Sequence, residues 1–187
     1  MTITFDLDSV IFDLDYLMAK AFDGSGKEYV RPTNWDVYKC YSLPIANKMV
    51  NLFKDDALYQ TPLLDKNMPN ILNNLMKRPN MRVLFVTERF LKQPLKTFMQ
   101  LTNAGIQCDF SQVYDRYGAK ADVLYDIHTD LHFDDSPIVV SGCLKKHIPI
   151  VMISNSTTPY NHHLRDKVEY YENLRAAMVS KGLCDLR

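Results

Sequence analysis

The stretch ITFDLDSVIFD at residues 3–13 decides how the rest of the chain is expected to fold. It opens with a short apolar run, Ile3 to Phe5, which predicts a buried β-strand. Two carboxylates, Asp6 and Asp8, follow directly where that strand ends. Ligands of open α/β sheets bind at the carboxyl ends of the strands. If the sheet is parallel, we therefore expect these two side chains to lie at a binding edge.

From residue 80 onward, apolar runs typical of strands alternate with stretches of helical periodicity. This alternation predicts an α/β fold with a parallel sheet and helices on both faces. The expected strands are 82–86, 131–133 and 148–153, with a short strand or loop at 107–114. The expected helices are 90–103, 119–127 and 137–146, followed by a last helix marked by Leu164, Val168, Tyr171, Leu174 and Met178 and ended by Gly182.

Polar side chains also stand at the ends of the later predicted strands and at the start of one helix. They are Thr87, Glu88, Arg89, Lys120, Asp134 and Asp135. Several carboxylates at one point repel each other unless a cation lies among them. Hard oxygen ligands select Mg²⁺, which also binds substrate phosphate. A carboxylate can attack phosphorus while a lysine and a hydroxyl hold the phosphoryl oxygens, so phosphoryl chemistry suits this set of residues.

The order of these residues resembles the four motifs of the haloacid dehalogenase (HAD) superfamily, in its phosphatase branch. The segment DLDSV at residues 6–10 comes first, then Thr87, then Lys120 and then the pair Asp134 and Asp135. A response-regulator receiver domain uses similar residues, but its acidic pair comes early and its lysine late. The resemblance implies a Rossmann-like three-layer core. One departure is Ser9, where glycine is usual, and it puts a side chain near the expected phosphate site.

In the motif that the first strand carries, the resemblance implies that Asp6 is the nucleophile and a Mg²⁺ ligand. Asp8 would be the general acid and base, with its backbone carbonyl also on the metal. A second Phe-Asp-Leu-Asp run, at residues 12–15, contains Asp13 and Asp15, which are an alternative pair of catalytic carboxylates. We favour Asp6 and Asp8 for two reasons. Val10 stands four residues after Asp6, where the family usually has Thr or Val. Asp13 then matches the last acidic residue of the family's first motif.

The other matched residues receive their roles from the same resemblance. Thr87 and Lys120 would hold the phosphoryl group. Asp134 is favoured as the direct metal ligand, with Asp135 beside it, although the pattern leaves open which of the two touches the ion. Arg89 belongs to a Thr-x-Arg form of the second motif and would reach the substrate.

About 80 residues separate Asp6 from Thr87, whereas a bare strand–helix–strand crossover needs about 30. The excess resembles the C1 cap that the family inserts after its first motif. We therefore expect a small helical cap at residues 16–78 and a core at 1–15 and 79–187. Helical periodicity predicts helices at 44–54 and 67–77 within the cap. Trp35 and Tyr38 also fall there, either as substrate-binding residues that stack on a nucleobase or as core of the cap.

The composition of the 187 residues is that of an ordinary globular protein, with 22 Lys and Arg against 22 Asp and Glu. A net charge of zero argues against a protein that coats nucleic acid. The charges are unevenly distributed along the chain, although they sum to zero. The first 15 residues hold four Asp, and residues 77–96 hold six basic residues against one acid. The chain has no 18-residue apolar run and no signal-peptide pattern, so we expect a cytoplasmic protein without membrane contact.

These features predict a Mg²⁺-dependent phosphomonoesterase that works through an aspartyl phosphate. The chain looks most like the 5'(3')-deoxyribonucleotidases, which implies a 5'-nucleotidase whose small phosphate ester is a (deoxy)nucleoside monophosphate. One alternative is a 3'-phosphatase of nucleic-acid ends or a sugar-phosphate phosphatase. The basic residues of 77–96 give some support to the 3'-phosphatase of nucleic-acid ends, but nucleic acid is not the favoured partner. A non-catalytic phosphate-binding regulatory module is a second alternative, and the sequence is compatible with a homodimer.

Overall fold

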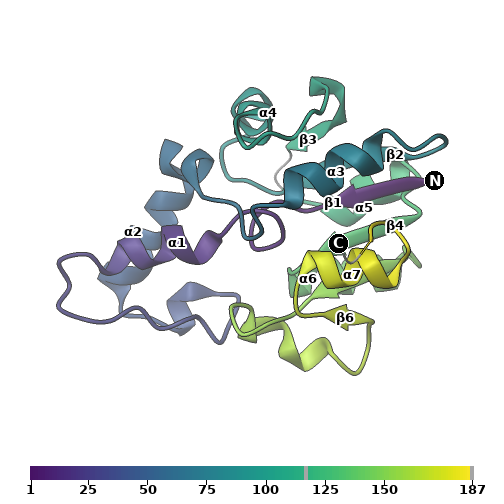
Figure 1. Cartoon of the computed structure of the whole chain (residues 1–187). Coiled ribbons are helices and arrows are strands. Elements are labelled where there is room, and N and C mark those ends of the chain that lie inside the picture. Colours follow the sequence, from purple (N-terminus) through teal and green to yellow (C-terminus); the bar gives the residue numbers. More distant parts are fainter. Residues whose placement is uncertain (116–117, 186–187) are drawn as a thin grey trace.

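The computed structural model describes residues 1–115 and 118–185 (Figure 1). Its centre is a six-stranded sheet with the order β3-β2-β1-β4-β5-β6, in which all neighbouring strands are parallel. The strands are β1 (Thr2–Phe5), β2 (Arg82–Thr87), β3 (Val113–Asp115), β4 (Leu131–Asp134), β5 (Ile150–Ile153) and β6 (Tyr170–Tyr171). The chain moves outward from β1 to β3 and then returns to the other side of β1. The strand order therefore reverses at β1 and β4, which is where open parallel sheets form their ligand crevice.

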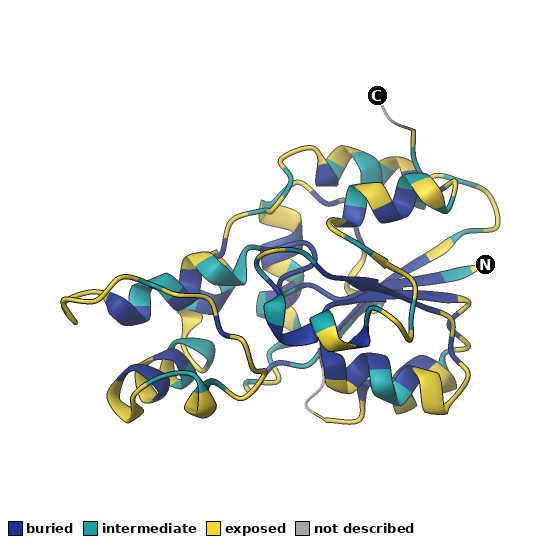
Figure 2. Cartoon of the chain, turned by 90° about the horizontal axis from the view of Figure 1, so that it is seen from below, coloured by how far each residue is buried: buried dark blue, intermediate teal, exposed yellow. Residues whose placement is uncertain are grey.

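Helices cover both faces of the sheet (Figure 2). On one face lie α3 (Met68–Met76), α4 (Pro94–Asn103) and α7 (Leu174–Ser180), and on the other lie α5 (Lys120–Asp126) and α6 (Pro137–Lys145). Strand β2 shows the two layers, because Val83 and Phe85 pack in the first cluster and Leu84 and Val86 in the second. The predicted α/β fold class is thereby confirmed. Among the described residues, no helix is both long and apolar enough to cross a membrane.

The predicted last helix, marked by apolar residues from Leu164 to Met178, is wrong. A 3₁₀ helix, η5 (Pro159–Leu164), comes first, and then β6 pairs with the end of β5. Only then does α7 begin, where the Asn173 side chain accepts a hydrogen bond from the backbone N–H of Ala176 at 2.8 Å. The helical spacing of the apolar residues thus spans three short elements, and pairing with β5 overrides the local pattern.

Two other predicted elements are shorter in the structure. The helix expected at 90–103 begins only at Pro94, because the residue before a proline is biased away from helical geometry and proline favours the first helical position. The segment expected as a strand or loop at 107–114 contains a 3₁₀ turn, η4 (Phe110–Gln112), and the first two of the three residues of β3. The other helices and strands agree with the prediction to within about two residues.

The segment between β1 and α3 forms a small helical unit beside the sheet (Figure 1). It contains α1 (Leu14–Ala19), α2 (Leu43–Phe53) and three 3₁₀ helices, η1 (Lys20–Phe22), η2 (Val37–Lys39) and η3 (Asp56–Gln60). It has its own apolar cluster, made of Met18, Ala21, Phe22, Ile45 and Met49. The chain enters and leaves this unit through two paired segments. Asp13 N–H donates to Pro62 O at 2.8 Å, and Leu64 N–H donates to Ile11 O at 2.9 Å.

Helix α3 packs on the sheet, because Met68, Leu72 and Leu75 belong to the same buried cluster as β1 and β2. The domain division predicted from the sequence, with a cap at 16–78, stays a prediction. The contacts of α3 favour a narrower cap that ends at the crossing near Pro62, and we call residues 14–60 the cap unit below.

A pair of matched truncations tests this boundary. Leu72→Ala should lower the free energy of unfolding of the sheet by about 3 kcal/mol, because it leaves a cavity in the main core. Met49→Ala should instead raise amide hydrogen exchange mainly within residues 14–60, since its cluster is separate. Hydrogen exchange followed by mass spectrometry reads both variants. Loss of protection confined to 14–60 in Leu72→Ala would place α3 in the cap.

Candidate active site

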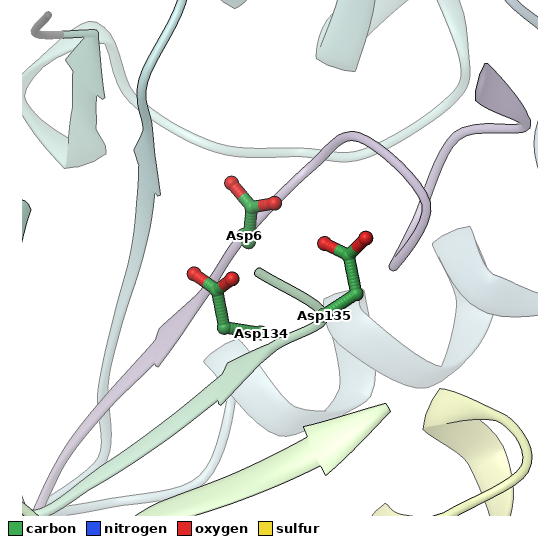
Figure 3. Close-up of side chains that lie close together, drawn as sticks. All are labelled: Asp6, Asp134 and Asp135. Carbon is green, nitrogen blue, oxygen red and sulfur yellow. The ribbon is translucent and has the colours of Figure 1, made fainter. Parts of the chain in front are cut away.

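Three buried carboxylates, those of Asp6, Asp134 and Asp135, meet at the carboxyl edge of the sheet (Figure 3). One ligand oxygen from each lies within 4.8 Å of the others. The register of two adjacent strands produces this meeting, because Phe5 of β1 pairs with Phe133 of β4. Asp6 N–H continues the pairing by donating to Phe133 O at 2.9 Å. The next residue of each strand is then an aspartate, so the two side chains end side by side.

Lys120, the first residue of α5, lies among these carboxylates. Its Nζ donates to Asp6 Oδ1 at 2.7 Å and to Asp134 Oδ2 at 2.8 Å, and its side chain is 3% exposed. The start of α5 is fixed by Glu88, whose Oε1 accepts a hydrogen bond from Lys120 N–H at 2.9 Å. The structure therefore brings the predicted lysine onto the predicted nucleophile, although the two are 114 residues apart in the chain.

The charges of this cluster are not balanced, since three carboxylates share one lysine. Burial raises the pKa of Asp6 from 3.8 to about 7, and the neighbouring charge of Asp134 adds to the rise. Burial also raises the pKa of Asp135 well above its usual value. Burial acts on Asp134 too, but Lys120 and His132 outweigh it and lower that pKa to about 2. The surplus negative charge and the oxygen donors fit a divalent cation such as Mg²⁺, which Asp6, Asp134 and Asp135 would hold.

His132 lies behind Asp134 and was not identified from the sequence. Its Nε2 is 2.9 Å from Asp134 Oδ2, and its Nδ1 is 2.8 Å from the hydroxyl of Thr4. Burial lowers the pKa of His132, which favours a neutral ring that donates to Asp134 and accepts from Thr4. The sequence did contain a signal for this contact. Side chains two residues apart in a strand lie on the same face, so His132 must share a face of β4 with Asp134.

Tyr160 and Asn161 hold Asp135. The Tyr160 hydroxyl donates to Asp135 Oδ2, and the side chain of the next residue, Asn161, donates to Asp135 O at 2.7 Å. Both residues belong to η5. The loop after β5 therefore fixes Asp135, and only the folded chain shows this contact.

The Asp8 carboxylate is not part of the three-carboxylate cluster. It pairs instead with Arg89, whose Nη2 lies 2.7 Å from Asp8 Oδ1 and whose Nε lies 3.0 Å from Asp8 Oδ2. The Arg89 side chain is 1% exposed, so these contacts give no support to the predicted substrate contact. Thr87, the last residue of β2, is buried beside the end of β1. Ser9 adopts a φ of 63°, the left-handed conformation for which the family's usual glycine is suited.

The second Phe-Asp-Leu-Asp run lies outside the cluster. Asp13 caps α1 by accepting a hydrogen bond from Tyr16 N–H at 3.2 Å, and Asp15 pairs with Arg31 at 2.7 Å. These structural roles favour Asp6 and Asp8 as the functional pair.

Of the two cap aromatics singled out in the sequence, only Trp35 lies near the site. Trp35 is 43% exposed and packs edge-on against Tyr160, with 5.2 Å between the ring centroids. It lines a cleft of about 580 Å³ together with Pro137, Lys145 and other residues of the core. The Tyr38 hydroxyl donates to Asn47 Oδ1 at 3.0 Å on α2, and Tyr38 is not among the residues that line this cleft.

Comparison with known proteins gives matches in structure only, because no family model and no curated protein matches the sequence. A haloacid dehalogenase-like family hydrolase from Streptococcus pneumoniae aligns with a TM-score of 0.66 at 16% identity, over 96% of this chain and 97% of that one. A HAD family hydrolase from Deinococcus radiodurans, with bound phosphate and sodium, aligns with a TM-score of 0.63 at 12% identity, over 97% and 96% of the two chains. The chain has the fold of the HAD hydrolases.

The same fold occurs in CbbY from Rhodobacter sphaeroides, solved in complex with xylulose 1,5-bisphosphate. It aligns with a TM-score of 0.55 at 13% identity, over 92% of this chain and 94% of that one. At such identities the likeness establishes the HAD fold, and the chemistry has to be argued from the site itself.

The raised pKa of Asp6 predicts how pH and Mg²⁺ act on stability. A carboxyl group whose pKa is raised by folding stabilises below its unfolded value and loses that contribution as the pH rises to the folded value. The metal-free protein should therefore lose stability through Asp6 between about pH 4 and 7. Mg²⁺ should restore stability at pH 8 and have little effect at pH 5, because it binds the ionised carboxylates.

Thermal unfolding with and without Mg²⁺ measures this directly. Asp6→Asn removes one buried charge, so the variant should melt a few degrees higher than the wild type at pH 8 without metal and respond less to Mg²⁺. An equal response to Mg²⁺ at both pH values and in both proteins would contradict the assignment.

Proposed function

We propose that the protein is a Mg²⁺-dependent phosphomonoesterase of the HAD type. The observation that carries this proposal is the buried cluster of Asp6, Asp134 and Asp135 with Lys120 bridging two of the three carboxylates. A divalent cation would offset the surplus negative charge of the three carboxylates. Together with Lys120, it would then give the site the positive charge that a phosphate dianion needs. Bound Mg²⁺ would supply positive charge that favours ionised Asp6 and balances the phosphate.

In this proposal Asp6 is the nucleophile. Lys120 contacts Oδ1, so we assign the attack on phosphorus to Oδ2. The new bond joins Asp6 to phosphorus, while the ester P–O bond breaks and its electron pair leaves with the alcohol oxygen. That oxygen takes a proton from Asp8. Asp8 then accepts a proton from water as the water oxygen attacks the phosphorus and releases Asp6. Lys120 and Thr87 would hold the phosphoryl oxygens in both steps.

The substrate that we favour is a (deoxy)nucleoside monophosphate. The cleft beside Trp35 lies next to Tyr160, which itself contacts Asp135 of the cluster. Its volume of about 580 Å³ is large enough for a nucleoside, and the exposed indole offers a stacking surface for a base. Lys145 and His163 also line the cleft and give it donors for polar groups.

A sugar phosphate is the second candidate, favoured by the bisphosphate ligand of the CbbY structure. The structure gives less support to a 3'-phosphatase of nucleic-acid ends than the basic sequence of residues 77–96 does. Of the basic residues in 77–96, Arg89 is buried on Asp8, and Lys96 pairs with Asp56 of the cap unit. The basic stretch therefore does not present all its charges to a nucleic-acid backbone.

Substitution of the proposed nucleophile tests the enzyme class. Asp6→Asn should lower Mg²⁺-dependent phosphate release from an aryl phosphate by about 1,000-fold or more, because the amide is not a competent nucleophile. Asp13→Asn is the matched control, since it makes the same change in the second Phe-Asp-Leu-Asp run, and asparagine caps a helix equally well. Retained activity in Asp6→Asn would remove Asp6 as nucleophile, and inactive wild-type protein would favour a phosphate-binding module.

Substitution of Trp35 tests the substrate class. Trp35→Ala should raise KM for a nucleoside monophosphate about tenfold through loss of stacking and leave KM for a small alkyl phosphate unchanged. Tyr38→Ala removes a similar aromatic ring outside the cleft and should change neither value. The same rise in KM for both substrates in Trp35→Ala would exclude base stacking. Steady-state phosphate release across nucleotides and sugar phosphates supplies all these constants.

A further inference from the structure

Both oxygens of the Asp8 carboxylate are held by one guanidinium. Arg89 makes a two-bond contact with them, through Nη2 to Oδ1 at 2.7 Å and through Nε to Oδ2 at 3.0 Å. Arg89 is fully buried, whereas the Asp8 side chain is 18% exposed, so the pair joins the interior to the site. Two parallel bonds of this kind fix the plane of a carboxylate as well as its place. The direction of Asp8 is therefore set by a residue 81 positions away in the chain.

Arg89 is itself fixed from its other side. Its Nη1 donates to Gln100 Oε1 at 2.9 Å and to Thr97 Oγ1 at 3.3 Å, both on α4. The Thr97 hydroxyl in turn donates to Asp115 Oδ2 at 2.6 Å at the end of β3. The guanidinium thus contacts Asp8 and α4 directly and is linked to β3 through Thr97, which leaves it little freedom to rotate.

The same network reaches the segment by which the cap unit joins the core. Gln100 Nε2 donates to Thr61 Oγ1 at 2.9 Å and to Leu58 O at 3.3 Å. The ring of Tyr59 lies against the guanidinium, with 5.2 Å from its centroid to Arg89 Cζ. Residues 58–61 directly precede Pro62, where the two paired segments between cap unit and core meet. A displacement of this segment would act on Arg89 through two contacts.

We propose that Arg89 is the positioning residue of Asp8 and couples its carboxylate to the joint of the cap unit. The inference rests on the proposed function, in which Asp8 transfers protons. In each turnover Asp8 gives its proton to the leaving oxygen as the P–O bond breaks and regains a proton from the water that attacks phosphorus, so one of its oxygens must be free of Arg89 during both transfers. The carboxylate that exists between the two transfers is the form that Arg89 holds. A residue that aims a general acid contributes by orientation, so its loss should lower kcat more than it raises KM.

A double-mutant cycle separates this role from a purely structural one. With an alkyl phosphate, whose poor leaving group needs a proton, Arg89→Met should lower kcat about 100-fold with KM changed less than threefold. In an Asp8→Ala background the same substitution should change kcat less than threefold, because the residue that Arg89 positions is already absent. With an aryl phosphate whose leaving group needs no proton, the effect of Arg89→Met on the first chemical step should largely disappear.

Losses that add in the double variant, or that are equal for both leaving groups, would overturn the proposal and make Arg89 a structural residue. If Arg89→Met does not fold, Arg89→Lys keeps the charge without the two-bond contact and should show the same pattern with a loss of about tenfold. Amide exchange at residues 58–61 reports the coupling without any turnover. It should be faster in Arg89→Met than in the wild type, and unchanged exchange would remove the coupling. Wild-type protein without phosphatase activity would instead refute the proposed function.

Discussion

The structure depends on one electrostatic constraint, which is the burial of three carboxylates and one lysine at one point. Asp6, Asp134 and Asp135 are each at least 95% buried, and Lys120 compensates only part of their charge. Such a cluster costs folding free energy, and proteins keep groups of this kind where function needs them. His132 and Tyr160 hold Asp134 and Asp135 by hydrogen bonds, and Thr4 holds His132 in turn. The interior is organised around the site as well as around apolar packing.

The topology makes the cluster inevitable once the register is set. Strands β1 and β4 are neighbours at the point where the strand order reverses, and each is followed by or ends in an aspartate. Strand β2 brings Thr87 to the same edge from the other side of β1. The cap unit then adds Trp35 over the loop after β5, so that the cleft beside the cluster is walled by both parts of the chain. One sheet edge thus gathers residues from the whole length of the sequence.

The convergence of side chains at one sheet edge could be predicted because it has a local cause. Asp6, Lys120 and Asp134 each stand at the end of an apolar run or the start of a helix, and parallel strands bring such ends together. The contacts of Arg89 could not be foreseen, because burial against Asp8 depends on how α4 and β3 pack around it. The packing of α3 on the sheet could not be foreseen for the same reason, and in the last segment pairing with β5 outweighed helical spacing.

The covalent role proposed for Asp6 separates this site from one that activates water directly or only binds phosphate. Acid quench during turnover of a radiolabelled phosphate ester, followed by peptide mapping, shows whether the phosphoryl group passes through the protein. We expect label on the peptide that contains Asp6, in the hydroxylamine-sensitive form of an acyl phosphate, and no label in Asp6→Asn. Release of phosphate by the wild-type protein with no label on that peptide at any quench time would contradict the role of Asp6.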